Sequence, residues 1–366
     1  RDSLIVARGL ITAGLDAEAA SVLKQFGRLE KDGTLPNMIS GQDAANRDTS
    51  DAPLWFFAAC ADMAATVRGR TFFDEYCGDR TIREILLNIG RRYVAGTPNG
   101  IAMDADSGLI FSPAHFTWMD TDHPAGTPRQ GYAVEIQALW YAALRLLGDI
   151  DPDPEEKNKW LALAETVKAS LARYFYRDEG FLADCLHAEP GQSAARAVAD
   201  DALRPNQLLA IALGAVTDTD MGRSMVEHCR ELLVPGAIRS LADRPLRHPL
   251  PIHHHGQLLN DPHHPYQGRY QGDEDTGRKP AYHNGTAWTW QFPVFCEAWV
   301  RVYGQTARPT ARAWMTSSLT LMEEGCAGHL PEILDGDYPH HQRGCDAQAW
   351  GLSEWLRVWI DLERSM

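Results

Sequence analysis

Aromatic and acidic residues are interleaved in the segment spanning residues 117–141. Trp118 lies two positions before Asp120, and a polar turn rich in proline and glycine leads through Arg129 to Glu135, where an apolar run begins. Aromatic faces pack against the C–H surfaces of sugars, and carboxylates bind their hydroxyl groups. Apolar walls with a few convergent polar groups are typical of ligand pockets. The segment therefore predicts a carbohydrate-binding site.

A second loop offers another carboxylate. Glu332 is surrounded by glycine, proline and aromatic residues, with Asp335 and Asp337 close by. Glycoside hydrolysis requires a protonated carboxyl group at the leaving oxygen and a second carboxylate that activates water or attacks the sugar. Apolar surroundings keep such an acid protonated, and the tryptophan and methionine before Asp120 could provide them. A single acid in a loop more often forms a cap or a turn, so the hydrolase hypothesis depends on the pair.

Residues 282–295, with the sequence YHNGTAWTWQFPVF, form a third segment of interest. Asn284 is most simply explained as the cap of the following helix, and the two phenylalanines as core residues. Trp288 lies so close to the loop that it could instead line a sugar subsite.

Two further helix starts carry side chains that could reach a ligand. In residues 46–55, Asp51 precedes Ala-Pro and fits a helix cap, whereas Asn46 and Asp48 could contact a ligand. In residues 201–211, Arg204 and the following Pro-Asn-Gln offer several hydrogen-bonding groups, although a capped helix is the simpler interpretation.

The composition excludes several classes of function. Of 366 residues, 44% are hydrophobic and 23% are charged, as in ordinary globular proteins. The net charge of −14 argues against a nucleic-acid partner, because phosphate binding needs a basic surface. The apolar runs are too short to span a membrane, and the pattern of a signal peptide is missing. We therefore expect a cytoplasmic protein that binds neither nucleic acids nor membranes.

Cysteine and histidine patterns predict no metal site and no cofactor. The seven cysteines are scattered and include no CxxC pair, which favours reduced thiols over a disulfide framework or a zinc ribbon. Histidines cluster at residues 253–255, 263–264 and 340–341, but adjacent histidines on irregular loops rarely converge on one ion. Glycine motifs for nucleotides and the GxSxG of serine hydrolases are missing too.

Helical periodicity dominates the elements that must position these side chains. The predicted helices cover residues 3–12, 17–29, 51–68, 79–95, 131–147, 154–175, 205–213, 218–233, 285–303, 309–324 and 347–362. Residues 100–113 predict a hairpin, and residues 180–185 a short strand. Long loops, which are usually functional, separate the helices in pairs. We predict an all-α fold in which residues 1–366 form a single (α/α)6 barrel, a toroid of six hairpins with its long loops at the active-site end. A two-domain helical array is the alternative.

The order of these motifs resembles that of the C-terminal amylo-α-1,6-glucosidase domain of glycogen debranching enzymes. The matching segments are RDSLIVARGLITAG, GTLPNMIS, NRDTSDAPLWF, GLIFSPAHFTWMD, TPRQGYAVEIQALWYAAL, LRPNQLLAI, AYHNGTAWTWQFPVF and PEILDGDYPHHQRGCDAQAWGLSEWLR. Together they cover nearly the whole chain. The resemblance implies a glucoamylase-like barrel, and we expect the chain to be the C-terminal part of a longer protein.

The resemblance also implies an activity, the inverting hydrolysis of an α-1,6-linked glucose at branch points of glycogen, limit dextrin or branched oligosaccharides. It implies that Asp120 is the general acid and Glu332 the general base, with Glu135 as a rival for an acid or substrate-gripping role. Further matching positions are implied to bind the substrate: Trp118, Arg129, Glu135, Asn206, Gln207, His283, Asn284, Trp288, Asp335, Asp337, Gln348 and Trp350.

One departure from the family and two rival functions stay open. Residues 288–290 read Trp-Thr-Trp where the family often has Trp-Pro-Trp, and the missing proline could shift the start of the helix. The chain could be a carbohydrate-binding domain that has lost catalysis. It could also be an isomerase or lyase on an α/α barrel that acts on a free sugar and uses His283 as a base.

Overall fold

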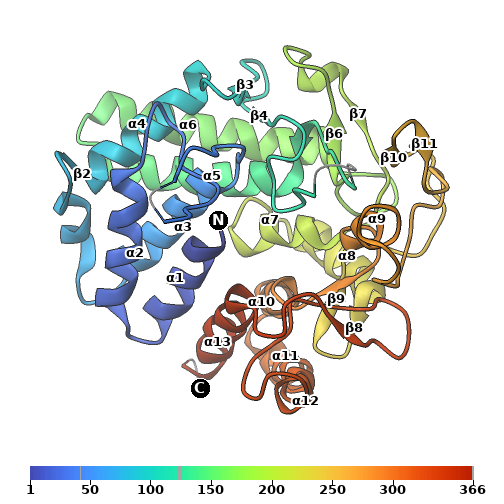
Figure 1. Cartoon of the computed structure of the whole chain (residues 1–366). Helices are drawn as coiled ribbons and strands as arrows, with labels where there is room; N and C mark the ends of the chain where they lie inside the picture. Colours follow the sequence, from blue (N-terminus) through green and yellow to red (C-terminus); the bar gives the residue numbers. More distant parts are fainter. Residues whose placement is uncertain (42, 122–125, 365–366) are drawn as a thin grey trace.

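Six helices form a closed inner ring in the computed structural model, which describes residues 1–41, 43–121 and 126–364 (Figure 1). Each helix of the ring contacts the next, and the last packs against the first. In order they are α1 (Asp2–Thr12), α3 (Ala52–Ala64), α5 (Val134–Ile150), α7 (Leu208–Ala212), α10 (Gln291–Tyr303) and α13 (Ala349–Glu363). Helix α3 is apolar and buried on nearly all sides, as a helix inside such a ring must be.

A second layer of helices covers this ring from outside. Each outer helix packs beside the inner helix that precedes or follows it in the sequence. They are α2 (Asp16–Arg28), α4 (Ile82–Ala95), α6 (Pro154–Ser170), α8 (Thr219–Cys229) and α11 (Arg308–Met315). Unlike α3, α2 buries only one stripe, which includes Leu23 and Phe26. The alternation of inner and outer helices confirms the predicted (α/α)6 architecture.

Short antiparallel strands tie the long connections together. A five-stranded sheet has the order β14-β13-β12-β9-β8, a three-stranded sheet has the order β5-β6-β7, and β1-β2, β3-β4 and β10-β11 are hairpins. Their bounds are β1 (Tyr76–Cys77), β2 (Arg80–Thr81), β3 (Ala102–Met103), β4 (Ile110–Phe111), β5 (Gly131–Ala133), β6 (Cys185–His187), β7 (Val198–Ala199), β8 (Leu233–Val234), β9 (Ala237–Arg239), β10 (His253–His254), β11 (Gln257–Leu258), β12 (Ala287–Trp288), β13 (Ile333–Leu334) and β14 (Gln342–Arg343). The connections also carry the short helices α9 (Lys279–Tyr282) and α12 (Ser317–Glu323).

The predicted elements differ from the structure mainly where strands form. The helix prediction is wrong for residues 131–133 and 287–288, which pair as β5 and β12 with segments far away in the sequence. The hairpin predicted in residues 100–113 is confirmed as β3 and β4. The strand predicted over residues 180–185 begins only at Cys185. A strand of two or three residues has no periodicity of its own, so only its distant partner defines it.

Two helices begin with the side-chain caps that their sequences predict, and a third does not. Helix α4 begins with a capping box formed by Thr81 and Glu84, and α6 begins after Asp153, whose side chain accepts a backbone N–H. The interpretation of Asp51 as the cap of α3 is wrong, because its side chain makes no capping hydrogen bond. The hydroxyl of Thr49 accepts the Ala52 N–H instead, at 3.1 Å.

A continuous hydrophobic core extends from Leu4 in α1 to Leu362 in α13. All seven cysteines carry free thiols, as predicted, and five of them are buried. Among the described residues, no helix has both the length and the apolar character that crossing a membrane would require.

A chain of ion pairs connects four helices of the inner ring. Arg8 of α1 binds Asp62 of α3 at 2.7 Å, and its guanidinium lies 3.7 Å from Glu354 of α13. Arg357, also in α13, binds Glu354 at 2.8 Å and Glu297 of α10 at 2.7 Å. These largely buried charges are therefore matched across helix boundaries, as buried charges must be.

The carboxylate of Glu297 makes the stability of this ring sensitive to acid. Burial opposes its ionisation, but the guanidinium groups of Arg357 and Arg301 outweigh burial and lower the pKa of Glu297 from 4.5 to about 2. Because the folded pKa is depressed, the stabilisation is complete above about pH 4.5 and is lost as the pH falls toward 2. We expect Glu297 to contribute about 3 kcal/mol at neutral pH.

Urea unfolding of the wild type and of Glu297→Gln, measured from pH 6 down to pH 2, tests this expectation. The difference in unfolding free energy should shrink as the pH falls. The exposed Glu363→Gln serves as the control, since a surface ion pair contributes little. A difference for Glu297→Gln that stays constant over this range would contradict the assignment.

Candidate active site

Asp120 lies in the loop that follows β4, and the side chains before it anchor that loop. Trp118 and Met119 are buried, whereas the side chain of Asp120 is 32% exposed. A guanidinium that the sequence did not single out binds it, because Arg1 Nη2 donates to Asp120 Oδ2 at 2.7 Å. Arg1 also lies 3.4 Å from Asp51, which fixes the position of its head group. The loop therefore presents a carboxylate to solvent beside a fixed cation.

Glu332 lies immediately before β13, and three donors orient its carboxylate. The hydroxyl of Tyr282 donates to Oε1 at 2.5 Å, and the amide of Gln348 donates to the same oxygen at 3.2 Å. The backbone N–H of Cys345 donates to Oε2 at 3.0 Å. The backbone of Glu332 is held as well, since the Thr289 N–H donates to its carbonyl oxygen at 3.3 Å, a bond that a proline at this position could not make.

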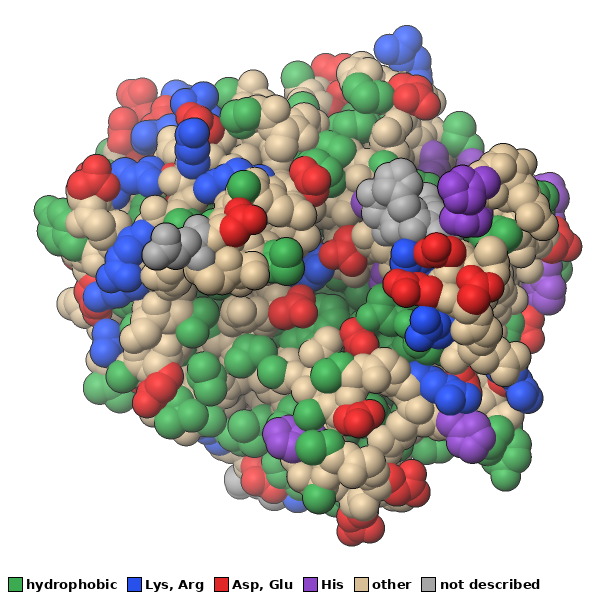
Figure 2. All heavy atoms as spheres, in the orientation of Figure 1, with side chains coloured by type: hydrophobic (Ala, Val, Ile, Leu, Met, Phe, Trp, Pro, Cys, Tyr) green, Lys and Arg blue, Asp and Glu red, His purple; other side chains and the backbone are tan. Residues whose placement is uncertain are grey.

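Tyr282 is the hydroxyl donor beside Glu332. Burial raises its pKa far above the ordinary value, and the negative charges of Glu332 and Asp120 raise it further. The hydroxyl therefore stays protonated and acts as a donor. Tyr282 is therefore in direct contact with Glu332 and within electrostatic reach of Asp120. Figure 2 shows acidic and hydrophobic side chains gathered around a depression in the centre of this face of the molecule.

Packed aromatic rings form a wall beside the acids. Trp118 meets Trp288 and Trp290 edge to face, with centroid distances of 4.9 and 5.2 Å, and Trp350 stacks on Trp290 at 4.8 Å. His283 stacks on Trp288 at 5.4 Å. All five side chains are almost completely buried. Such contacts stabilise a rigid arrangement beyond their burial alone.

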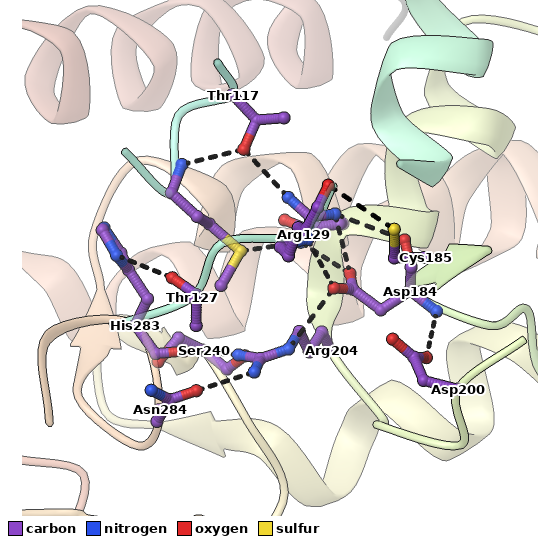
Figure 3. Close-up of polar contacts among 12 residues, drawn as sticks. Thr117, Thr127, Arg129, Asp184, Cys185, Asp200, Arg204, Ser240, His283 and Asn284 are labelled. Atoms are coloured by element: carbon purple, nitrogen blue, oxygen red, sulfur yellow. Dashed lines mark hydrogen bonds and ion pairs between the residues drawn. The ribbon is translucent and has the colours of Figure 1, made fainter. Parts of the chain in front are cut away.

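A buried ionic network lies beneath this wall (Figure 3). Both outer nitrogens of Arg129 donate to the Glu135 carboxylate at 2.6 Å, and Arg129 Nε lies 2.7 Å from Asp184 Oδ2. The three side chains are at most 4% exposed. Glu135 and Arg129, both predicted to contact substrate, thus bind each other. Sequence reasoning missed Asp184, because its flanking residues, FLADCLH, carry no motif.

Asn206 joins the ionic network to the aromatic wall. Its amide nitrogen donates to Asp184 Oδ1 at 2.8 Å, and its amide oxygen accepts the indole N–H of Trp118 at 2.8 Å. Arg204 lies 3.4 Å from Asp184 and donates to the Asn284 amide oxygen at 2.7 Å. The network therefore sets the orientation of Trp118 and of the loop that carries Asp120.

The other predicted binding residues occupy varied positions. Gln207 is buried and accepts the Leu182 N–H. Asp335 is buried against Arg343, whereas Asp337 is partly exposed and accepts the hydroxyl of Tyr266. Asp48 is exposed.

His283 is not accessible to solvent. Burial lowers its pKa well below the ordinary value, so the ring is neutral, and its Nδ1 lies 3.3 Å from the Thr127 hydroxyl. No cluster of three metal-ligating side chains occurs in the part of the chain that the structure describes.

Comparison with known proteins decides the family. The pattern of the family described as amylo-alpha-1,6-glucosidase matches residues 1–357. The chain belongs to this family. The chain is also 23% identical, over 84% of its length, to the glycogen debranching enzyme of Saccharomyces cerevisiae. The chain spans only 24% of the length of that enzyme.

Solved structures show the same fold for this chain. A bacterial glucoamylase complexed with acarbose matches with a TM-score of 0.62 at 14% identity, over 99% of this chain and 48% of the glucoamylase. The GH63 mannosylglycerate hydrolase of Thermus thermophilus, in complex with glucose, matches with a TM-score of 0.62 at 15% identity, over 98% of this chain and 91% of that one. The domain is thus a glycoside hydrolase-like barrel with the six-hairpin fold.

Proposed function

We propose that this domain is an inverting α-glucosidase that removes single glucose units linked α-1,6 at the branch points of glycogen-like glucans. The observation that supports the proposal is that the hydroxyl of Tyr282 donates to Glu332 and is also within electrostatic reach of Asp120, next to a cluster of packed aromatic rings. Membership of the family and the name of the yeast relative support the choice of a branched α-glucan as substrate.

Asp120 acts as the general acid in this mechanism. Its proton passes to the glycosidic oxygen as the bond from that oxygen to C1 of glucose breaks. The carboxylate that remains is the species that Arg1 binds at 2.7 Å, so Arg1 stabilises the charge left after the transfer.

Glu332 acts as the general base on the opposite face of the sugar. It removes a proton from water as the water oxygen bonds to C1, and the product is β-glucose. Tyr282 and the Cys345 N–H hold the two oxygens of Glu332 in place. These donors position the carboxylate toward the water, because a base must lie within hydrogen-bond reach of the proton it takes.

The buried members of the predicted binding set support the site from below. Trp118, Trp288 and Trp350 form a stiff, almost completely buried cluster behind the site, and Arg129 with Glu135 holds that cluster in place through Asp184. Gln348, Asp337 and the exposed Asp48 stay predictions for direct sugar contact. Preorganised support of this kind keeps reacting groups in their productive geometry.

Proton NMR of the sugar released from a glucosyl-α-1,6-branched maltooligosaccharide tests the function. We expect β-glucose to appear first and the α anomer to form later by mutarotation. Initial release of α-glucose would contradict inversion. Binding of the oligosaccharide without any glucose release would favour a carbohydrate-binding domain that has lost catalysis. An isomerase that uses His283 is unsupported, because that side chain is completely buried and neutral.

A further inference from the structure

A broad cleft lies beside Asp120. Its volume is about 730 Å³, within the range of ligand-binding pockets. Arg1, Asp2 and Asp120 line one end of the cleft. Glu332 is not among the described residues that line the cleft.

The position of the cleft beside only one of the two acids indicates which part of the substrate it could bind. The general acid must touch the oxygen of the leaving group, whereas the general base lies on the opposite face of the sugar, where water attacks. A cleft that reaches Asp120 but not Glu332 therefore lies on the leaving-group side. The first turn of α1, the outer helix α2 and residues 37–39 of the following loop form its walls.

The lining of the cleft suits an uncharged, hydroxyl-rich ligand. The charged residues lie together at the Asp120 end and pair with one another through Arg1. Beyond them the cleft presents the neutral polar side chains of Ser21, Gln25 and Asn37. The amide oxygen of Asn37 is buried and accepts no hydrogen bond from the residues that the structure describes, so a ligand hydroxyl could satisfy it.

Apolar side chains alternate with these polar groups. Val22, Phe26 and Ile39 line the cleft, and Met38 projects into solvent with 61% of its surface exposed. An exposed thioether is adaptable and packs well against irregular apolar surfaces, such as the C–H face of a sugar. Ser21 and Gln25 are one helical turn apart on α2, so they present their polar groups along one face.

We infer that this cleft binds the glucan chain that leaves, that is, the main-chain segment from which the α-1,6-linked glucose is cut. The inference rests on the proposed function and extends it, because it places the leaving group on α2 and on residues 37–39. Asn37, Met38, Ser21 and Gln25 then determine the preference for a branched oligosaccharide over a small leaving group.

Two substrates that differ only in the leaving group test this assignment. α-Glucosyl fluoride fills the glucose subsite but has no leaving sugar, whereas the branched maltooligosaccharide has one. The variants Asn37→Ala and Met38→Ala should lower kcat/KM for the oligosaccharide about tenfold each, as expected for the loss of an important binding contact. The kcat/KM for hydrolysis of the fluoride should change less than about twofold, because neither substitution alters the residues that bind the glucose unit.

A blocking variant and a matched control sharpen the test. Ser21→Trp, at an exposed position of α2, should fill the cleft and lower activity on the oligosaccharide alone. Leu258→Ala removes an exposed apolar side chain from β11, which is far from α2 in Figure 1, and should change neither substrate.

The outcomes separate the two proposals. Equal losses on both substrates, or unchanged activity on both, would overturn the assignment of the cleft. If the wild type cleaved neither substrate, the proposed glucosidase function would be contradicted. The assignment of the cleft, which depends on that function, would then be contradicted as well.

Discussion

Asp120→Asn is expected to lower kcat on the branched oligosaccharide by about a hundredfold to ten-thousandfold, the usual contribution of a general acid or base. Glu332→Gln should have an effect of the same size. The structural cost of both changes should be small, because Asp120 is one-third exposed, and a glutamine at position 332 can keep the oxygen that accepts from Tyr282 and Gln348 and lose only the acceptor of the Cys345 N–H. Thermal unfolding of each variant should therefore stay close to that of the wild type.

α-Glucosyl fluoride separates the roles of the two acids. Fluoride leaves without needing a proton, so Asp120→Asn should retain much of its activity on this substrate, whereas Glu332→Gln should not, because water still needs a base. Asp106→Asn, in an exposed turn, is the control and should behave as the wild type. Full activity of Asp120→Asn on the oligosaccharide would exclude it as the general acid.

Asp184→Ala should strongly destabilise the domain, with a loss of about 3–5 kcal/mol of unfolding free energy. The Asp184 side chain is 1% exposed and lies 2.7 Å from Arg129 and 3.4 Å from Arg204. Its removal leaves Arg204 buried without an ionic partner in the part of the chain that the structure describes and leaves the Asn206 amide nitrogen with only the Met119 sulfur as an acceptor. A typical domain has only about 5–15 kcal/mol to lose.

Urea unfolding followed by tryptophan fluorescence measures this effect, provided that the m-value is unchanged. The matched control is Asp149→Ala, which breaks an exposed ion pair with Arg70 and should cost less than about 1 kcal/mol. Asp184→Asn, which keeps the shape and one acceptor oxygen, should fall between the two. A loss below about 1 kcal/mol for Asp184→Ala would show that the network contributes little to stability.

Periodicity and local caps were sufficient to predict the inner and outer helices of the barrel, although not all of their starts. The stripe that α2 buries and the cap of α6 by Asp153 involve residues within about one helical turn of each other, so they can be recognised without knowing the fold. The resemblance of whole motifs to a family added the barrel and the two acids as predictions. The resemblance also implied that Arg129 and Glu135 bind substrate; in the structure both side chains are buried and bind each other.

What the sequence by itself determined is the order of the helices, their burial pattern and the types of acid that a glycoside hydrolase needs. The contacts between residues far apart in the sequence depend on closure of the inner ring of helices. Arg1 meets Asp120 across 119 positions, Tyr282 meets Glu332 across 50, and Asp184 meets Arg129 across 55. The strands that fix these loops are only two or three residues long and pair with remote segments. Contacts of this kind leave no local pattern, because neither partner has a preference that its own neighbours reveal; they exist only once the six inner helices bring the loops together.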